Sequence, residues 1–169
     1  MERSVETSMV SFISVGSNIG EKLENCRKGI AEIKNLDQTT LLGQSGFYRT
    51  SPVDYMDQDW FVNAAVKIRT RMSPIALLHA LQKIQKKIGR KKGGIRFGPR
   101  ILDLDIIFYD LLIMDTKKLV LPHPRMHKRA FVLKPICDID QKVIHPVLQM
   151  DVKTLLDGLN DNDQEIHRI

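Results

Sequence analysis

The apolar pattern up to residue 109 divides the chain into six elements, in the order strand, helix, strand, strand, helix, strand. Alternation of apolar and polar residues predicts a strand, whereas apolar residues three or four apart predict a helix. The predicted strands are Met9–Val15, Thr39–Thr50, Phe61–Arg71 and Leu102–Tyr109. This order is that of a ferredoxin-like α+β sandwich, in which helices pack on one face of a mainly antiparallel sheet. Because Leu102–Tyr109 is the most apolar strand, we expect it at the centre of the sheet.

Both predicted helices have identifiable ends. Asn18 and Glu21 have the spacing of a capping box, which would start the first helix. Its apolar face comprises Leu23, Cys26, Ile30 and Ile33. Ser73 is a candidate N-cap for the second helix, with Pro74 at the first helical position. Gly89 is expected to end that helix.

The composition is typical of one globular domain, and we expect it to span residues 1–169. Apolar residues make up 43% of the chain and charged residues 27%. No apolar stretch approaches a membrane span, and residues 1–8 lack the apolar region of a secretory signal. Cys26 and Cys137 have no metal-ligand spacing, so we expect reduced thiols in a cytoplasmic protein. The polar tail, residues 160–169, is expected to be a disordered end.

The positive charge of the chain is concentrated in two segments. The net charge is +6, yet residues 71–100 contain nine Lys or Arg and no Asp or Glu. Residues 117–134 add six more basic residues and again no acidic one. These two segments bracket the Leu102–Tyr109 strand, and such localised positive charge predicts an anionic ligand, either a phosphate compound or a nucleic acid.

Asp103 and Asp105 form the central motif. Side chains alternate along a strand, so both carboxylates point to the same face. Like charges that close together need a partner, and a hard cation such as Mg²⁺ suits carboxylate oxygens. The simpler interpretation is a solvated face of an edge strand. The Gly98-Pro99-Arg100 sequence directly upstream favours a metal and phosphate site instead.

The glycine-rich segment 90–101 carries a cluster of cations with an aromatic residue among them. The cations are Arg90, Lys91, Lys92, Arg96 and Arg100. Guanidinium groups bind phosphate through two parallel hydrogen bonds, although a solvated basic loop would have the same composition. Phe97 is exposed in such a loop unless it closes on a flat ligand. The chain has no P-loop motif, and His123 could be either structural or a donor to a nucleotide.

Several ordered motifs together resemble the 6-hydroxymethyl-7,8-dihydropterin pyrophosphokinase family of folate biosynthesis. The resemblance covers about residues 9–146. The matching motifs are Gly16-Ser17-Asn18, Phe47-Tyr48-Arg49-Thr50, Asn63-Ala64-Ala65-Val66, Gly89-Arg90, Arg96-Phe97-Gly98-Pro99-Arg100, Asp103-Leu104-Asp105, Pro122-His123 and Arg129-Ala130-Phe131. The element from Gly98 to Asp105 is close to diagnostic of that family.

The resemblance implies a monomeric enzyme that transfers pyrophosphate from ATP to the pterin hydroxymethyl group and releases AMP. It implies two Mg²⁺ ions held by Asp103 and Asp105. Catalytic roles are implied for these two residues and for Arg90 and Arg100, which would clamp phosphate. The implied pterin-binding residues are Thr50, Ser51, Pro52, Val53, Phe61, Asn63, Phe97 and Phe131. The implied ATP-binding residues are Leu78, Gln82, Gln85, Arg90, Lys92, Arg96, Arg100, Ile106, Val120, His123 and Arg129.

Three positions depart from the pattern that the resemblance implies. Gln85 stands where a glutamate is common, Lys92 where an arginine is frequent, and Ser51 where a proline is frequent. None of these changes removes a predicted metal ligand or clamp arginine.

Two other classes of function fit parts of the sequence. Another two-metal enzyme, such as a nucleotidyltransferase, would need a third carboxylate on a neighbouring strand, and Phe61–Arg71 offers none. A nucleic-acid-binding module would use the basic segments, but aromatic residues are only 6% of the chain and two carboxylates lie among the cations. We therefore expect small-molecule partners, with no nucleic acid and no membrane.

Overall fold

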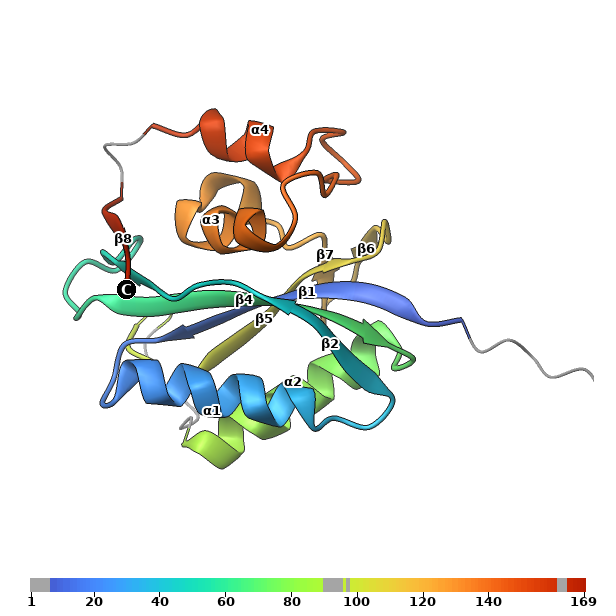
Figure 1. The fold of residues 1–169 in the computed structure, drawn as a ribbon, viewed down its shortest axis with the longest axis horizontal. Coiled ribbons are helices and arrows are strands. Elements are labelled where there is room, and N and C mark those ends of the chain that lie inside the picture. The colour runs from blue at the N-terminus through green and yellow to red at the C-terminus, as the bar shows by residue number, and fades with distance from the viewer. Residues whose placement is uncertain (1–6, 90–95, 97, 161–163) are drawn as a thin grey trace, which may run out of the picture.

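The computed structural model describes residues 7–89, 96, 98–160 and 164–169. The predicted order of six elements is confirmed, although the second predicted strand is divided into two (Figure 1). Further helices and strands follow the last of the six predicted elements. The elements are β1 (Met9–Ser17), α1 (Lys22–Lys34), β2 (Thr39–Gln44), β3 (Tyr48–Thr50), β4 (Phe61–Thr70), α2 (Pro74–Ile88), β5 (Asp103–Tyr109), β6 (Met114–Asp115), β7 (Val120–Leu121), a 3-10 turn (Met126–Lys128), α3 (Ala130–Ile139), α4 (Val152–Asp157) and β8 (Ile166–Arg168).

The main sheet is antiparallel and follows the order β5–β1–β4–β3–β8, with β2 also paired to β4. The prediction of one continuous strand over Thr39–Thr50 is wrong, because the segment between β2 and β3 leaves the regular ladder. There the Ser45 hydroxyl accepts a hydrogen bond from Ala65 N–H at 2.8 Å, and the Asp138 carboxylate accepts one from Gly46 N–H at 3.1 Å. Side-chain oxygens thus replace backbone partners at this break.

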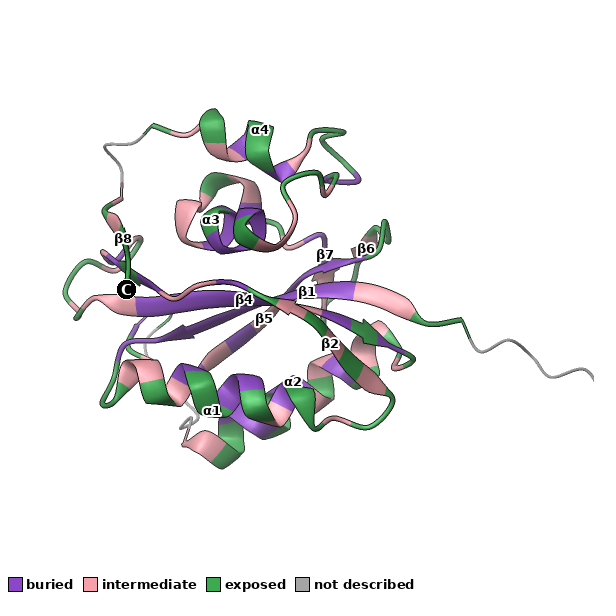
Figure 2. Ribbon diagram, viewed as in Figure 1, coloured by how far each residue is buried: buried purple, intermediate pink, exposed green. Residues whose placement is uncertain are grey.

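Helices cover both faces of the sheet, not one as predicted. Figure 1 shows α1 and α2 on one side, and α3 with α4 beyond it on the other. The reason lies in β1, where seven consecutive residues are buried, as Figure 2 shows in purple. Neighbours on this strand enter different cores: Ile13 packs under α1 and α2, whereas Phe12 packs under α3. A strand that is apolar on both faces requires a cover on each.

The strand β5 lies at an edge of the sheet, so its predicted central position is wrong. Its apolar residues are buried by layers above and below it, and Leu104 and Ile106 belong to the core beneath α1 and α2. The segment after β7 covers part of the free edge, since His123 N–H donates to the Ile107 carbonyl at 2.9 Å. The apolar composition of β5 therefore reflects its burial between layers and not a central position among the strands.

The predicted ends of α2 are confirmed, whereas the predicted capping box before α1 is wrong. The Ser73 hydroxyl accepts from Ala76 N–H at 3.2 Å, and Gly89 ends α2 in the left-handed region at φ 118°. At α1 the N-cap is Glu21, which makes no side-chain cap bond. The Asn18 side chain bonds to Gln58 and to the Arg100 backbone instead of capping α1.

The prediction of a disordered polar tail is wrong for residues 164–169. In this segment β8 pairs antiparallel with β3, and Ile169 N–H donates to the Phe47 carbonyl at 3.0 Å. The first residues of the predicted tail include 161–163, which lie outside the described residues. In the described part of the chain no helix has the length and apolar character needed to span a membrane.

Candidate active site

One cavity of about 430 Å³ opens on the α3 face of the sheet and extends around the edge of β5. Its lining comes from β1, β3, β4, α2, β5, α3 and the loops between them. The lining residues are Ser14, Gly16, Thr50, Ser51, Val53, Asp54, Phe61, Asn63, Leu78, Gln82, Gln85, Arg96, Gly98, Arg100, Asp103, Leu104, Asp105, His123, Arg129, Phe131 and Gln164. Farther along the same sheet face, Phe12 and Phe108 fill the space under α3, so the cavity is the part of that face left uncovered.

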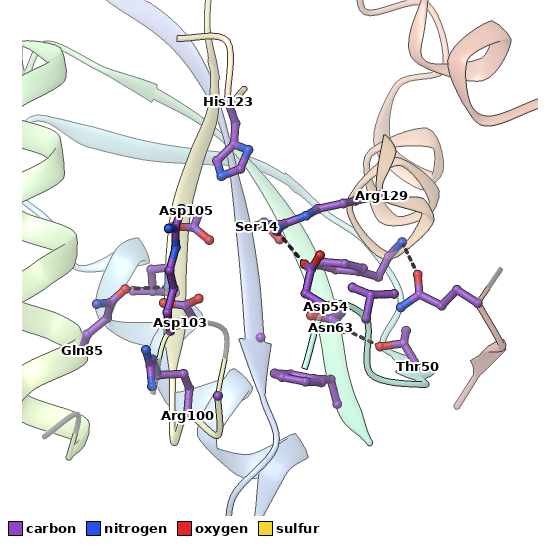
Figure 3. Close-up of a pocket in the computed structure, with 18 of the residues that line it drawn as sticks. Ser14, Thr50, Asp54, Asn63, Gln85, Arg100, Asp103, Asp105, His123 and Arg129 are labelled. Atoms are coloured by element: carbon purple, nitrogen blue, oxygen red, sulfur yellow. Dashed lines mark hydrogen bonds and ion pairs between the residues drawn. The ribbon is translucent and has the colours of Figure 1, made fainter. Parts of the chain in front are cut away.

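Asp103 and Asp105 share one face of β5, as the sequence predicted. The intervening Leu104 is buried on the opposite face, whereas both carboxylate residues are partly exposed (Figure 3). In the strand register Asp103 lies opposite Gly16, and Asp105 lies opposite Ser14. Two small residues on β1 therefore leave open space beside the carboxylates.

The register continues across the sheet to an amide. Gly16 on β1 pairs with Asn63 on β4, so Asp103, Gly16 and Asn63 form one row over three strands. Strand spacing places the ends of this row about 10 Å apart. A Cβ atom at position 16 would lie 2.7 Å from Asn63 Oδ1, so any larger residue there would displace that side chain. We call Arg100, Asp103 and Asp105 the carboxylate end of the pocket, and Thr50, Asn63 and Phe131 its amide end.

The amide end holds Asn63 in a fixed orientation. Asn63 is buried, and its Nδ2 donates to the Thr50 hydroxyl at 2.7 Å (Figure 3). Of the predicted pterin-binding residues, Thr50, Ser51, Val53, Phe61, Asn63 and Phe131 line the cavity. Pro52 is buried but is not part of the lining. Phe97 lies outside the described residues.

Most of the predicted nucleotide-binding residues lie toward the carboxylate end. Those in the cavity lining are Leu78, Gln82, Gln85, Arg96, Arg100, His123 and Arg129. Ile106 and Val120 are not brought to the cavity: Ile106 faces the core under α1 and α2, and Val120 lies in the separate hairpin of β6 and β7. Arg90 and Lys92 lie outside the described residues.

Gln85 and His123 have identifiable structural partners. The buried Gln85 accepts a hydrogen bond from Leu104 N–H at 2.7 Å through Oε1, so its amide fixes α2 against the start of β5. His123 Nδ1 accepts from Arg125 N–H at 3.2 Å. Burial, followed by the nearby Arg129 charge, lowers the pKa of His123 to about 4. The ring is therefore neutral at pH 7, with its proton on Nε2.

The Asp103 and Asp105 carboxylates suit a Mg²⁺ ion whose remaining ligands are not protein side chains. Within the described ranges no group of three or more His, Cys, Asp or Glu side chains is arranged to hold a metal ion. Mg²⁺ commonly binds one or two carboxylates and takes its remaining ligands from water and substrate phosphates. Two adjacent carboxylates with open space beside them fit that donor set.

Sequence reasoning missed three residues that join the walls of the pocket. Asp54 accepts from Arg125 at 2.6 Å and from Arg129 at 3.1 Å, and Figure 3 shows the Asp54 carboxylate in direct contact with Arg129. Asn18 Nδ2 donates to Gln58 Oε1 at 2.9 Å, while its Oδ1 accepts from the Arg100 backbone N–H at 2.7 Å.

Gln164 is the third missed residue, and it reaches the pocket from the predicted disordered tail. Of these three residues, only Asn18 could have been found from the sequence, through the Gly16-Ser17-Asn18 motif. The contacts of Asp54 and Gln164 join segments that are far apart in the chain, so local sequence patterns do not reveal them.

Comparison with known proteins identifies the family. A sequence model described as 7,8-dihydro-6-hydroxymethylpterin-pyrophosphokinase (HPPK) matches residues 12–141. This chain belongs to the HPPK family. Its Bacillus subtilis relative, named 2-amino-4-hydroxy-6-hydroxymethyldihydropteridine pyrophosphokinase, is 40% identical over 134 residues, which cover 79% of this chain and 80% of the relative. The Haemophilus influenzae relative of the same name is 37% identical over 142 residues, covering 84% of this chain and 88% of the relative.

Other relatives in the HPPK family are much longer. The Schizosaccharomyces pombe protein named folic acid synthesis protein fol1 is 37% identical over 150 residues, which cover 89% of this chain and only 20% of that protein. This chain thus spans about a fifth of that relative. Among solved structures, a Plasmodium falciparum HPPK-DHPS superposes with a TM-score of 0.71 at 12% identity, over 92% of this chain and 46% of that one. At that identity the likeness shows the fold alone.

Proposed function

We propose that this chain transfers pyrophosphate from ATP to the hydroxymethyl group of 6-hydroxymethyl-7,8-dihydropterin in folate biosynthesis. Family membership supports the activity. The observation that carries the proposal is the row from Asp103 across Gly16 to Asn63. A metal and phosphate site at one end and a fixed amide at the other, about 10 Å apart, match a flat ring whose hydroxymethyl group must reach a triphosphate.

At the amide end, Asn63 would read the hydrogen-bonding edge of the pterin. Thr50 accepts from its Nδ2, which leaves the Oδ1 atom and the remaining amide hydrogen for the ring. Phe131, with Phe97 as the predicted partner on the opposite face, would stack on the ring, since aromatic faces suit a flat and largely apolar ligand. These contacts orient the hydroxymethyl group toward the carboxylate end.

At the carboxylate end, the cationic side chains would hold the triphosphate in line. The pterin hydroxyl oxygen forms a bond to the β-phosphorus, the bond from that phosphorus to the α-phosphate bridging oxygen breaks, and AMP leaves while the hydroxyl proton is released. Arg96 and Arg100 line the pocket, Arg129 reaches into it from the N-cap of α3 beside Phe131, and Arg90 and Lys92 are predicted to join them. Neutral His123 would donate through Nε2. Positioning and charge neutralisation are the main requirements of such transfers.

Asp103 and Asp105 would hold the two Mg²⁺ ions that accompany ATP. Bound Mg²⁺ supplies charge neutralisation on the phosphate oxygens as negative charge shifts toward the leaving AMP. The chain's own contribution is to present two carboxylates on one rigid strand face beside small residues. We also propose that the enzyme is monomeric and cytoplasmic and acts on small molecules, without nucleic acid or membrane.

The test is AMP release from MgATP with and without the pterin. We expect pterin-dependent AMP and a pterin diphosphate product in equal amounts. Removing Mg²⁺ with EDTA should abolish both. Asp103→Asn and Asp105→Asn should be inactive, while Asp110→Asn is a matched control, because Asp110 is exposed just after β5 and outside the pocket. No pterin-dependent AMP from the wild-type chain would overturn the proposed function.

A further inference from the structure

The side chain of Gln164 joins two walls of the amide end. Its Nε2 donates to the Ser51 carbonyl at 2.8 Å, and its Oε1 accepts from Phe131 N–H at 3.2 Å. Ser51 belongs to the loop after β3, whereas Phe131 lies in the first turn of α3. One half-buried amide from a third segment therefore connects the loop with the helix that carries the aromatic ring.

The Phe131 contact supplies a missing helix cap. The first N–H groups of a helix have no partner within the helix, and a side chain at the N-cap usually accepts from one of them. The N-cap of α3 is Arg129, and it makes no such side-chain bond. Gln164 provides an acceptor from outside the helix, and in doing so it fixes the start of α3 against the loop.

The backbone around Gln164 is held in register with the same loop. Ser51 N–H donates to the Glu165 carbonyl at 2.9 Å, and Glu165 N–H donates to the Ser51 hydroxyl at 2.9 Å. Just beyond, β8 pairs with β3, with Ile166 opposite Thr50. Farther along, the His167 ring stacks on Trp60 with centroids 6.0 Å apart and planes 10° apart. These contacts fix where the Gln164 side chain begins.

We propose that Gln164 is a positioning residue for the pterin: it sets the separation between the Ser51 wall and the Phe131 ring. This inference rests on the proposed function. The side-chain amide meets both demands with one planar group, since its nitrogen donates to a carbonyl and its oxygen accepts from an N–H. A glutamate would place a carboxylate against the Ser51 carbonyl, and an apolar side chain would leave both partners unsatisfied.

The experiment compares Gln164→Met, which keeps the volume and removes both bonds, with Gln164→Glu, which keeps only the acceptor. We expect KM for the pterin to rise about tenfold in Gln164→Met, with kcat and the KM for ATP within about twofold of wild type. Gln164→Glu should also raise the pterin KM. Glu165→Gln is the matched control, because its exposed side chain turns to His167 while its backbone bonds are kept.

The kinetic pattern separates positioning from a purely structural role. Loss of structure alone would lower kcat through a smaller active fraction and leave both KM values unchanged. The inference would be overturned by a lower kcat with both KM values unchanged in Gln164→Met. An unchanged pterin KM in that variant, or equal increases in the two KM values, would overturn it as well. If Gln164→Met does not fold, an unchanged pterin KM in Gln164→Glu has the same consequence. Failure of the wild-type chain to turn over pterin would instead overturn the proposed function.

Discussion

The two ends of the pocket are built in opposite ways. The carboxylate end comes from a single stretch, since Arg100, Asp103 and Asp105 lie within six residues on and just before β5. The amide end is assembled from β3, β4 and the start of α3, and Gln164 connects two of its walls from the last six residues of the chain.

The side chains at the two ends are oriented by different kinds of contact. Strand alternation alone sets the direction of the two carboxylates, because residues two apart share a face. Asn63 also lies on a strand, but its amide is oriented by Thr50, thirteen positions earlier, and its approach depends on Gly16 of another strand. Changes at the carboxylate end should therefore affect chemistry, and changes at the amide end should affect pterin binding.

The largest effect is expected from Asp103→Ala or Asp105→Ala. We expect AMP release to fall by about 1,000-fold or more, since the proposed metal ions lose a ligand. The protein should remain folded, because both side chains are partly exposed and lie outside the two apolar cores. Turnover assays and thermal melts of the metal-free proteins measure the two quantities. AMP release near the wild-type rate would contradict the assignment of the carboxylate end.

Arg100→Ala should lower kcat by about 100-fold, the usual effect of removing one group that stabilises transition-state charge. The pterin KM should change little, because Arg100 belongs to the carboxylate end. Steady-state kinetics with each substrate varied in turn make this comparison. Arg69→Ala is a suitable control, since Arg69 is an exposed arginine on β4 outside the pocket. Loss of pterin affinity equal to the loss of kcat would mean that the two ends are not separable.

His123 should make stability depend on pH. Its folded pKa of about 4 lies below the ordinary 6.5, so the unfolded chain binds more protons between these values. Stability is therefore fully present above about pH 6.5 and is lost as the pH falls toward 4, by roughly 2 kcal/mol from this partly exposed ring.

Urea unfolding of the substrate-free protein at several pH values tests this expectation. His123→Asn keeps an acceptor for Arg125 N–H and removes the titration, so its free energy of unfolding should fall less over the same range. His127 and His145, whose pKa values burial also lowers, leave a residual slope in that variant. An identical pH dependence in both proteins would show that His123 is not buried in its neutral form.

Gly16→Ala should have the smallest of these effects and act on the other end. The new Cβ would displace Asn63 Oδ1, which lies 2.7 Å from its position, and weaken the bond to Thr50. We expect the pterin KM to rise about tenfold while the ATP KM is unchanged, which corresponds to about one hydrogen bond. Gly158→Ala is a control, because its Cβ would make only ordinary contacts at 3.5 Å. A larger change in kcat than in pterin KM would contradict the division into two ends.

Local sequence was sufficient for the elements whose pattern is set by their own residues. Ser73, Pro74 and Gly89 set the ends of α2, apolar alternation located β4, and short apolar runs located β1 and β5. Local reasoning failed where another segment supplied a competing partner. The Ser45 hydroxyl interrupts the Thr39–Thr50 strand by taking Ala65 N–H, and Asn18 bonds to the Arg100 backbone and Gln58 instead of capping α1.

The shared face of Asp103 and Asp105, the strand and helix order, and the clustering of positive charge around β5 were all predictable from the sequence alone. Each follows from residue spacing or composition, which need no knowledge of distant contacts. Tertiary packing was needed to show that β5 is an edge strand, that both sheet faces are covered, and that Gln164 lines the pocket. Strand pairing and side-chain bonds between segments more than 100 positions apart, such as Gln164 with Ser51, arise only when the chain is packed.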